Sequence, residues 1–263
     1  MRAYLVVFRM RLQMELQYRG AMIGGILCQM FFGLVLTALY RALYAGHPQS
    51  VPIEHVVNYV WLQQAFFRML VATDPDLLDK IRSGNISYDM CRPVNIYWFY
   101  YARIAAQKLM GSLMRGVPML IVAALLPKGW GLTLPHSPFG LLAAILSLVP
   151  GFFCMCALEN VTMGFTMRTL DPRGIQSMLN LLMMTFSGNL LPLTLFPDSW
   201  QRVVTLLPYA QLLDAPIRLY TGEYAVTEAL RIIPVQALWA GLLIMLGTGI
   251  WKANRKRMIV QGG

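Results

Sequence analysis

The chain has 263 residues, of which 57% are hydrophobic and only 13% are charged, and its mean hydropathy is +0.54. A soluble globular chain carries roughly 25% charged residues, so the composition excludes that class and indicates an integral membrane protein. The formal net charge is +10, but the basic residues are spread among segments that flank apolar runs. We therefore predict one all-α transmembrane domain, 1–263, that contacts the lipid bilayer and binds no nucleic acid.

The first segment of the chain is predicted to lie along the membrane surface. Residues 2–19 contain two apolar stripes that are separated by polar side chains, among them Arg2, Arg9 and Arg11. This pattern is typical of an amphipathic N-terminal helix wedged between lipid and protein. Because arginines interrupt the apolar run, we expect no cleavable signal peptide here.

Six apolar runs that follow are predicted to be transmembrane helices. Their approximate ranges are 21–43, 55–72, 96–126, 139–165, 175–191 and 229–251. A membrane-spanning helix needs about 20 apolar residues, so the third run is too long for one crossing, and its first turns are expected in the cytosol. Most of the 22 Lys and Arg residues lie in the segments on one side of this layout. The positive-inside rule then predicts that both termini are cytosolic.

Residues 192–227 are predicted to form short, broken helices on the outer side. Pro192, Pro197, Pro208 and Pro216 separate apolar pieces that are too short to cross a bilayer. Such pieces either lie on the outer surface or dip into the membrane where protein shields their ends.

A polar island, residues 73–93, separates the second and third predicted spans. Asp74 can cap the first amides of a helix, Pro75 suits the first helical position, and Gly84 provides a stop. The island therefore predicts a short cytosolic helix over 74–84 with a small apolar face. Two alternatives stay open: this helix docks on another protein, or it is a solvated loop helix.

Four ionisable residues of the spans require an explanation, because charges in lipid are costly. Arg68 is expected to reach the inner surface or to pair with an aspartate of the island. Glu159 is expected to form a structural ion pair with Lys108 or Arg115. The alternative is that these side chains line the path of a substrate or relay a proton.

Motifs of covalent chemistry are missing from the sequence. No Walker loop, HExxH or GxSxG motif occurs, and the three histidines lie far apart. The four cysteines are expected to be free thiols. We predict that the chain is not an enzyme and holds no metal or cofactor of its own.

The island also carries a family resemblance. Its run DLLDKIRSGNISYDMCRPVN, residues 76–95, resembles the I-x-x-G-x-I/L-x-x-x-L-x-R-P segment of permease subunits from type-2 ABC exporters. The likeness is to the small six-span bacterial branch that includes viologen-exporter permeases. The matching residues are Ile81, Gly84, Ile86, Arg92 and Pro93, and Met90 replaces the leucine. The segments Tyr18–Gly20 and Ser187–Gly222 resemble the same proteins.

This resemblance implies a role in ATP-driven export. In such exporters the loop between spans two and three is a coupling helix that binds a separate ATPase subunit, which holds ATP and Mg²⁺. The implied contact residues are Asp74, Asp76, Leu77, Leu78, Asp79, Lys80, Ile81, Arg82 and Gly84, with the three apolar side chains buried against the ATPase and the charged ones on the rim.

The resemblance further implies a second permease chain, in a homodimer or a heterodimer, and a location in the bacterial cytoplasmic (inner) membrane. An ion-gradient-driven secondary transporter and a non-transporting membrane scaffold are the competing hypotheses. The first predicts ionisable residues clustered at mid-membrane.

Overall fold

The structure is a computed structural model that describes residues 2–17, 19–46, 51–71, 74–168 and 172–257. Every regular element in these ranges is a helix. In chain order the elements are α1 (Arg2–Gln17), α2 (Arg19–Gly46), α3 (Ile53–Val71), α4 (Pro75–Arg82), α5 (Ile86–Met90), α6 (Ile96–Leu125), α7 (Pro138–Thr166), α8 (Pro172–Phe186), η1 (Leu193–Leu195), α9 (Asp198–Val204), α10 (Ala210–Thr221), η2 (Val226–Glu228) and α11 (Ala229–Arg257).

Within the described ranges, four helices are long and apolar enough to cross a membrane. They cover Gly20–Gly46, Ile96–Leu125, Pro138–Thr166 and Val226–Arg255. The other two predicted spans correspond to α3 and α8. The 19-residue α3 is long enough but too polar to count among the four, and α8 is too short because it has only 15 residues. At 1.5 Å per residue, α8 is about 22 Å long, which is less than the hydrocarbon core of a bilayer.

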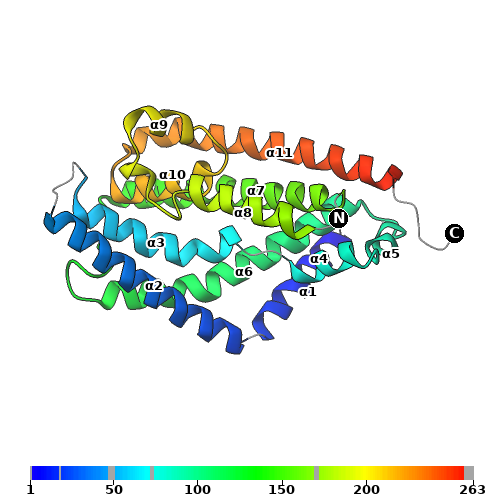
Figure 1. The fold of residues 1–263 in the computed structure, drawn as a ribbon, viewed down its shortest axis with the longest axis horizontal. Coiled ribbons are helices and arrows are strands. Elements are labelled where there is room, and N and C mark those ends of the chain that lie inside the picture. Colours follow the sequence, from blue (N-terminus) through cyan, green and yellow to red (C-terminus); the bar gives the residue numbers. More distant parts are fainter. Residues whose placement is uncertain (1, 18, 47–50, 72–73, 169–171, 258–263) are drawn as a thin grey trace.

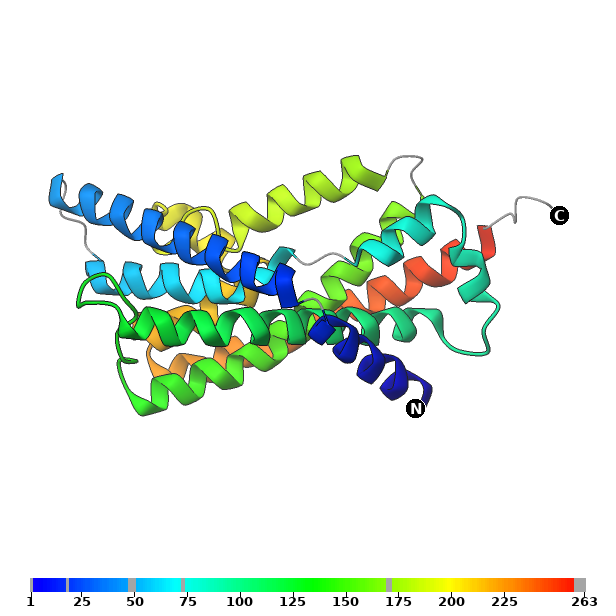
Figure 2. The ribbon, with the colours of Figure 1, turned by 90° about the horizontal axis from the view of Figure 1, so that it is seen from below.

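The long helices run roughly along the long axis of the molecule (Figure 1). The short helices α4 and α5 form a helical hairpin at one end of the molecule, which we call the hairpin end. The beginning of α1 and the end of α11 lie toward the same end. The end of α2, the start of α3, the loop between α6 and α7, and α9 lie at the other end. Figure 2 shows α1 projecting away from the bundle on the side opposite α8.

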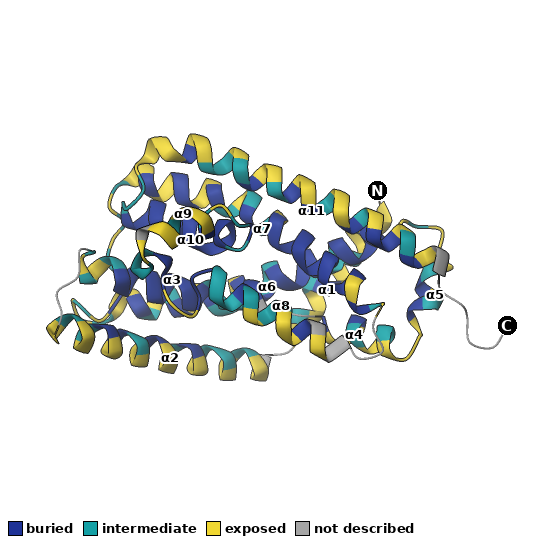
Figure 3. Ribbon diagram, turned by 45° about the horizontal axis from the view of Figure 1, so that its top comes forward, coloured by how far each residue is buried: buried dark blue, intermediate teal, exposed yellow. Residues whose placement is uncertain are grey.

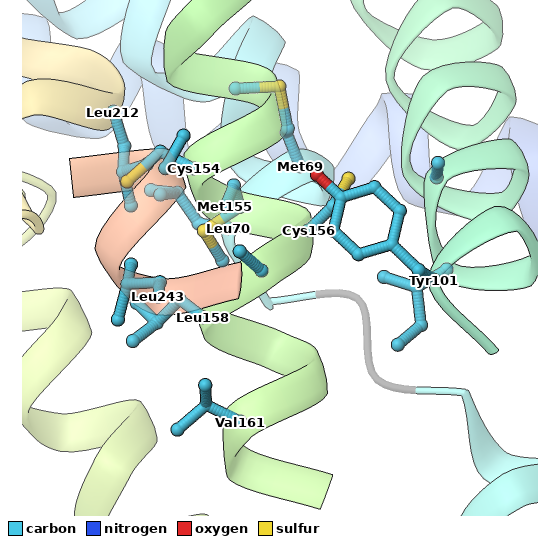
Figure 4. Packing of buried hydrophobic residues seen from close by; sticks show 14 of the residues in the cluster. Met69, Leu70, Tyr101, Cys154, Met155, Cys156, Leu158, Val161, Leu212 and Leu243 are labelled. Atoms are coloured by element: carbon cyan, nitrogen blue, oxygen red, sulfur yellow. The ribbon is translucent and has the colours of Figure 1, made fainter. Parts of the chain in front are cut away.

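The core of the molecule forms around α7, which packs against α10 and α11. Figure 4 shows Met155 and Leu158 of α7 beside Leu212 of α10 and Leu243 of α11, all buried in one apolar cluster. Helix α6 lies against α1 and α3. The bundle therefore links the N-terminal helix to the C-terminal half of the chain through α6 and α7.

The predicted outer helices differ in how deeply they lie. Within 192–227, α9 carries exposed residues, whereas every residue of α10 is buried. Helix α10 is enclosed by α3, α7 and α11 and is no surface helix. The sequence left open whether the pieces of this region lie on the surface or are shielded by protein. Helix α10 is shielded by protein.

Figure 3 shows that α2 and α11 carry many exposed residues along their length, and large apolar side chains are numerous among them. Ile23, Leu27 and Phe31 of α2 and Leu238 and Met245 of α11 are exposed. A soluble protein rarely exposes apolar surface on this scale, and this exposure agrees with a membrane protein.

Candidate functional site

The polar island folds into two short helices, and its first helix has a complete set of end signals. The Asp74 carboxylate caps α4 by accepting hydrogen bonds from the amides of Asp76, at 3.2 Å, and Leu77, at 3.4 Å. Pro75 occupies the first helical position. Gly84 has φ +74°, the left-handed conformation that ends a helix at little cost for glycine. We call the unit from Asp74 to Met90 the hairpin.

An ionic network fixes the start of the hairpin to two long helices. Asp74, which is fully buried, accepts hydrogen bonds from Arg103 of α6 and, at 3.4 Å, from Arg11 of α1. The exposed Asp76 carboxylate binds the same guanidinium groups, at 2.6 Å from Arg103 and 2.9 Å from Arg11. Two arginines thus hold two aspartates, and the start of α4 is tied to both α1 and α6.

Arg68 was expected to reach the inner surface or to pair with an aspartate of the island, and among the described residues its ion pair is with neither Asp74 nor Asp76. The Arg68 guanidinium lies 3.9 Å from the Glu15 carboxylate instead. Arg11 and Arg103 approach the aspartates from two helices and occupy their oxygens. The sequence places Arg11 and Arg103 far from the island, and neither stands out among the many basic residues near the membrane surface.

A second carboxylate network holds the two helices of the hairpin together. Asp89 of α5 accepts hydrogen bonds from Lys80 of α4, at 2.6 Å, and from the hydroxyl of Tyr100, at 2.7 Å. Arg92 lies 3.0 Å from the same carboxylate. Burial opposes ionisation of Asp89, but these donors outweigh it and lower its pKa. Asp89 is therefore a structural anion, which the sequence analysis missed.

Burial decides which side of the hairpin is available to a partner. Leu77 is fully buried within the chain itself, and Ile81 packs against the same core cluster. The expectation that Leu77 is a partner contact is therefore corrected, because its apolar surface is already covered by this chain. The exposed side chains of the hairpin include Asp79, at 77%, and Tyr88, whose residue exposure is 76%. Arg82 is also exposed.

The remaining predicted contacts divide between the two sides of the hairpin. Leu78 is partly exposed, and Gly84 is exposed at the turn. Lys80 faces α5 through its bond to Asp89. The outer face of the hairpin is therefore polar with one large aromatic side chain, and it is not the apolar face that the periodicity of α4 predicts.

Deeper in the bundle, the structure brings together two of the four ionisable residues of the predicted spans. The Lys108 ammonium lies 3.9 Å from the Glu159 carboxylate, and both residues are buried. Lys108 also donates a hydrogen bond of 2.9 Å to the Met69 carbonyl, in the last turn of α3, where carbonyls lack helical partners. Arg115 lies elsewhere and donates to the Ala21 carbonyl at 3.3 Å. Lys108 thus connects α3, α6 and α7.

A third charged cluster lies at the opposite end of the molecule. Asp214 of α10 binds Arg218, at 3.0 Å, and accepts a hydrogen bond of 2.9 Å from Tyr59 of α3. Glu223 lies 3.7 Å from Arg218 and 3.9 Å from His55. Burial raises the pKa of Glu223 to about 7, and the nearby arginine only partly opposes this. This cluster fixes α10 to the start of α3.

The cysteines and the possible metal-binding side chains of the described residues form no cluster. No group of three or more His, Cys, Asp or Glu residues is arranged to hold a metal ion in the part of the chain that the structure describes. Cys28, Cys91, Cys154 and Cys156 are free cysteines. The notable polar features of the described residues are ion pairs that join helices.

Comparison with known protein families identifies the class of the chain. Residues 52–262 match the family model described as ABC-2 family transporter protein. The searches of curated proteins and of solved structures gave no significant match. The family match covers most of the chain, including the hairpin, the bundle core and α11. The chain therefore belongs to the ABC-2 transporter family.

Proposed function

We propose that the protein is the permease subunit of an ATP-driven exporter and that the hairpin is its docking site for a separate ATPase subunit. The observation that carries this proposal is the rigid attachment of the hairpin. Asp74 and Asp76 tie it to α1 and α6, while Asp79 and Tyr88 remain exposed. A docking element that must transmit force needs both an exposed face and a stiff connection to the membrane domain.

The ion pairs provide a route from the hairpin to the membrane helices. Arg103 and Lys108 both belong to α6, so a displacement of the hairpin acts directly on that helix. Lys108 then joins α6 to α3, through Met69, and to α7, through Glu159. ATP binding and hydrolysis on the partner would move these helices and open the path to the outer side, where α10 lies. In this account Glu159 and Lys108 serve coupling and not proton relay.

We further propose that α3 and α8 complete six spans, with both termini in the cytosol of the bacterial inner membrane. The polar side chains of α3 support this for that helix, because they face protein. Asn58 donates a hydrogen bond of 2.7 Å to Thr133, and the side-chain amide of Gln63 donates one to the Asn189 carbonyl. A span enclosed by other helices can be more polar than one that faces lipid. A second permease chain, identical or different, would complete the transport path.

Purification of the tagged protein from its own host in mild detergent tests the proposal. The expected result is co-purification of an ATPase that carries a Walker loop, with or without a second permease chain. Recovery of the protein alone across several detergents would contradict the proposal and favour a secondary transporter or a scaffold. A solvent-accessible cysteine beside the turn of the hairpin, introduced as Ser83→Cys after the exposed Cys28 and Cys91 are replaced by serine, would test the orientation: it should react only with a reagent that reaches the cytosolic side.

A further inference from the structure

A basic pocket lies at the hairpin end and is formed by elements other than the two helices of the hairpin. Its volume is about 580 Å³, and it lies between the start of α1, the loop from α5 to α6, and the last turns of α11. Arg92 comes from the loop, Lys252 and Arg255 come from α11, and Tyr4 and Trp251 form aromatic walls. These segments are far apart in the sequence, so the fold assembles the pocket.

The charge of the pocket selects an anion. Three of its lining side chains are cationic, and none of its lining residues is acidic. Asp89 lies 3.0 Å from Arg92 but does not line the pocket, and it also binds Lys80 at 2.6 Å. The Asp89 carboxylate therefore pairs with both Lys80 and Arg92, and the pocket keeps an excess of positive charge. Guanidinium and ammonium groups together bind phosphate oxygens well.

The surroundings of the pocket indicate where the anion comes from. The exposed apolar residues Leu238, Leu242 and Met245 follow helical spacing along α11, and Lys252 is seven residues beyond Met245, on the same side of the helix. Lys252 and Arg255 are exposed basic residues at the end of a long apolar helix, the position at which basic side chains flank a membrane span. A lipid-facing apolar strip therefore leads directly to the cationic pocket.

We propose that this pocket binds the phosphate headgroup of an anionic phospholipid from the inner leaflet, with its acyl chains along the exposed face of α11. The bound lipid would join α11 to the loop that follows the hairpin. Two contacts of Asn95 hold that loop in place. Its side chain caps α6, and its backbone N–H donates a hydrogen bond of 3.1 Å to the Tyr4 hydroxyl. The lipid is a fixed component of the protein surface and not the transported substrate.

Native mass spectrometry of the full-length protein in a neutral detergent tests this proposal. The probes are phosphatidylglycerol, phosphatidylcholine and inorganic phosphate, each added separately. The test variant is Lys252→Gln with Arg255→Gln. Its matched control is Arg2→Gln with Arg9→Gln, which removes the same charge from exposed positions of α1 outside the pocket.

We expect wild type and the control to bind phosphatidylglycerol equally and the test variant to bind it at least tenfold more weakly, while phosphatidylcholine binds weakly to all three. Equal binding of phosphatidylglycerol by the test variant would overturn the proposal. Displacement of the lipid by millimolar inorganic phosphate would also overturn the proposal, in favour of a site for a free anion. The proposal would fail as well if the test variant lost a bound protein partner while its lipid binding stayed unchanged.

A separate variant keeps the test decisive if the double substitution unfolds the protein. Lys252→Arg preserves the charge and should retain phosphatidylglycerol binding within about twofold, whereas Arg255→Gln alone should show an intermediate loss. If Arg255→Gln is folded and binds the lipid as wild type does, the assignment of the pocket is wrong.

Discussion

Replacing Asp74 by alanine removes the residue on which most of the hairpin's attachment depends. The change deletes the N-cap of α4, which is worth about 0.5–2 kcal/mol. It also leaves Arg11 and Arg103 without their buried partner, and breaking a buried ion pair costs about 3–5 kcal/mol. Because Asp76 still binds both arginines, we place the total local loss at the lower end, about 3 kcal/mol.

Hydrogen exchange of the α4 amides in the purified protein measures this loss. A local destabilisation of about 3 kcal/mol accelerates exchange on the order of 100-fold, since each 1.4 kcal/mol is about a factor of ten. Asp79→Ala is the control, because the Asp79 side chain is 77% exposed and its loss should cost under about 0.5 kcal/mol. If Asp74→Ala accelerates exchange less than about threefold, the ionic network does not hold the hairpin, and the coupling route through α6 loses its basis.

Three further predictions concern the buried groups. Lys108→Met strands the Glu159 carboxylate and should lower the melting temperature in detergent strongly, while adding Glu159→Leu should restore most of the loss; no recovery would mean that the pair itself is not the cause. Because burial raises the pKa of Glu223 from 4.5 to about 7, the folded state holds this proton more tightly than the unfolded state. The contribution of Glu223 to stability should therefore be largest below pH 4.5 and fall by up to about 3 kcal/mol as the pH rises to about 7, and Glu223→Gln should remove this contribution from the melting profile; a profile unchanged by the substitution would refute the assignment. Leu77→Ala should cost about 2–5 kcal/mol by unfolding in detergent, as expected for a side chain inside the core, and a near-zero cost would return Leu77 to the docking face.

Local signals in the sequence predicted the first helix of the hairpin. The cap at Asp74, the proline after it and the glycine at position 84 act through the nearest turns of backbone, so their effect is readable without the rest of the fold. The apolar spacing of α4 likewise predicted that one face is buried. It did not say what buries that face, and Leu77 proved to be covered by its own chain.

The sequence did not predict which distant arginines pair with the aspartates of the hairpin. Arg103 and Arg11 are 29 and 63 residues from Asp74, and only the packing of α1 against α6 brings them to it. The complete burial of α10 depends in the same way on α3, α7 and α11 closing around it. The Lys108 and Glu159 pair was anticipated because two opposite charges in apolar helices have few other ways to avoid lipid.

The central claim is that the exposed face of the hairpin binds an ATPase subunit. The most direct measurement is the amount of ATPase that co-purifies with Asp79→Lys/Tyr88→Ala, compared with wild type and with the control Glu54→Lys/Trp200→Ala, whose substitutions lie in exposed residues at the other end of the molecule. The account predicts that the hairpin variant loses most of the ATPase while its membrane insertion and melting temperature are unchanged, and that the control retains it. Retention of wild-type amounts by the hairpin variant would contradict the account.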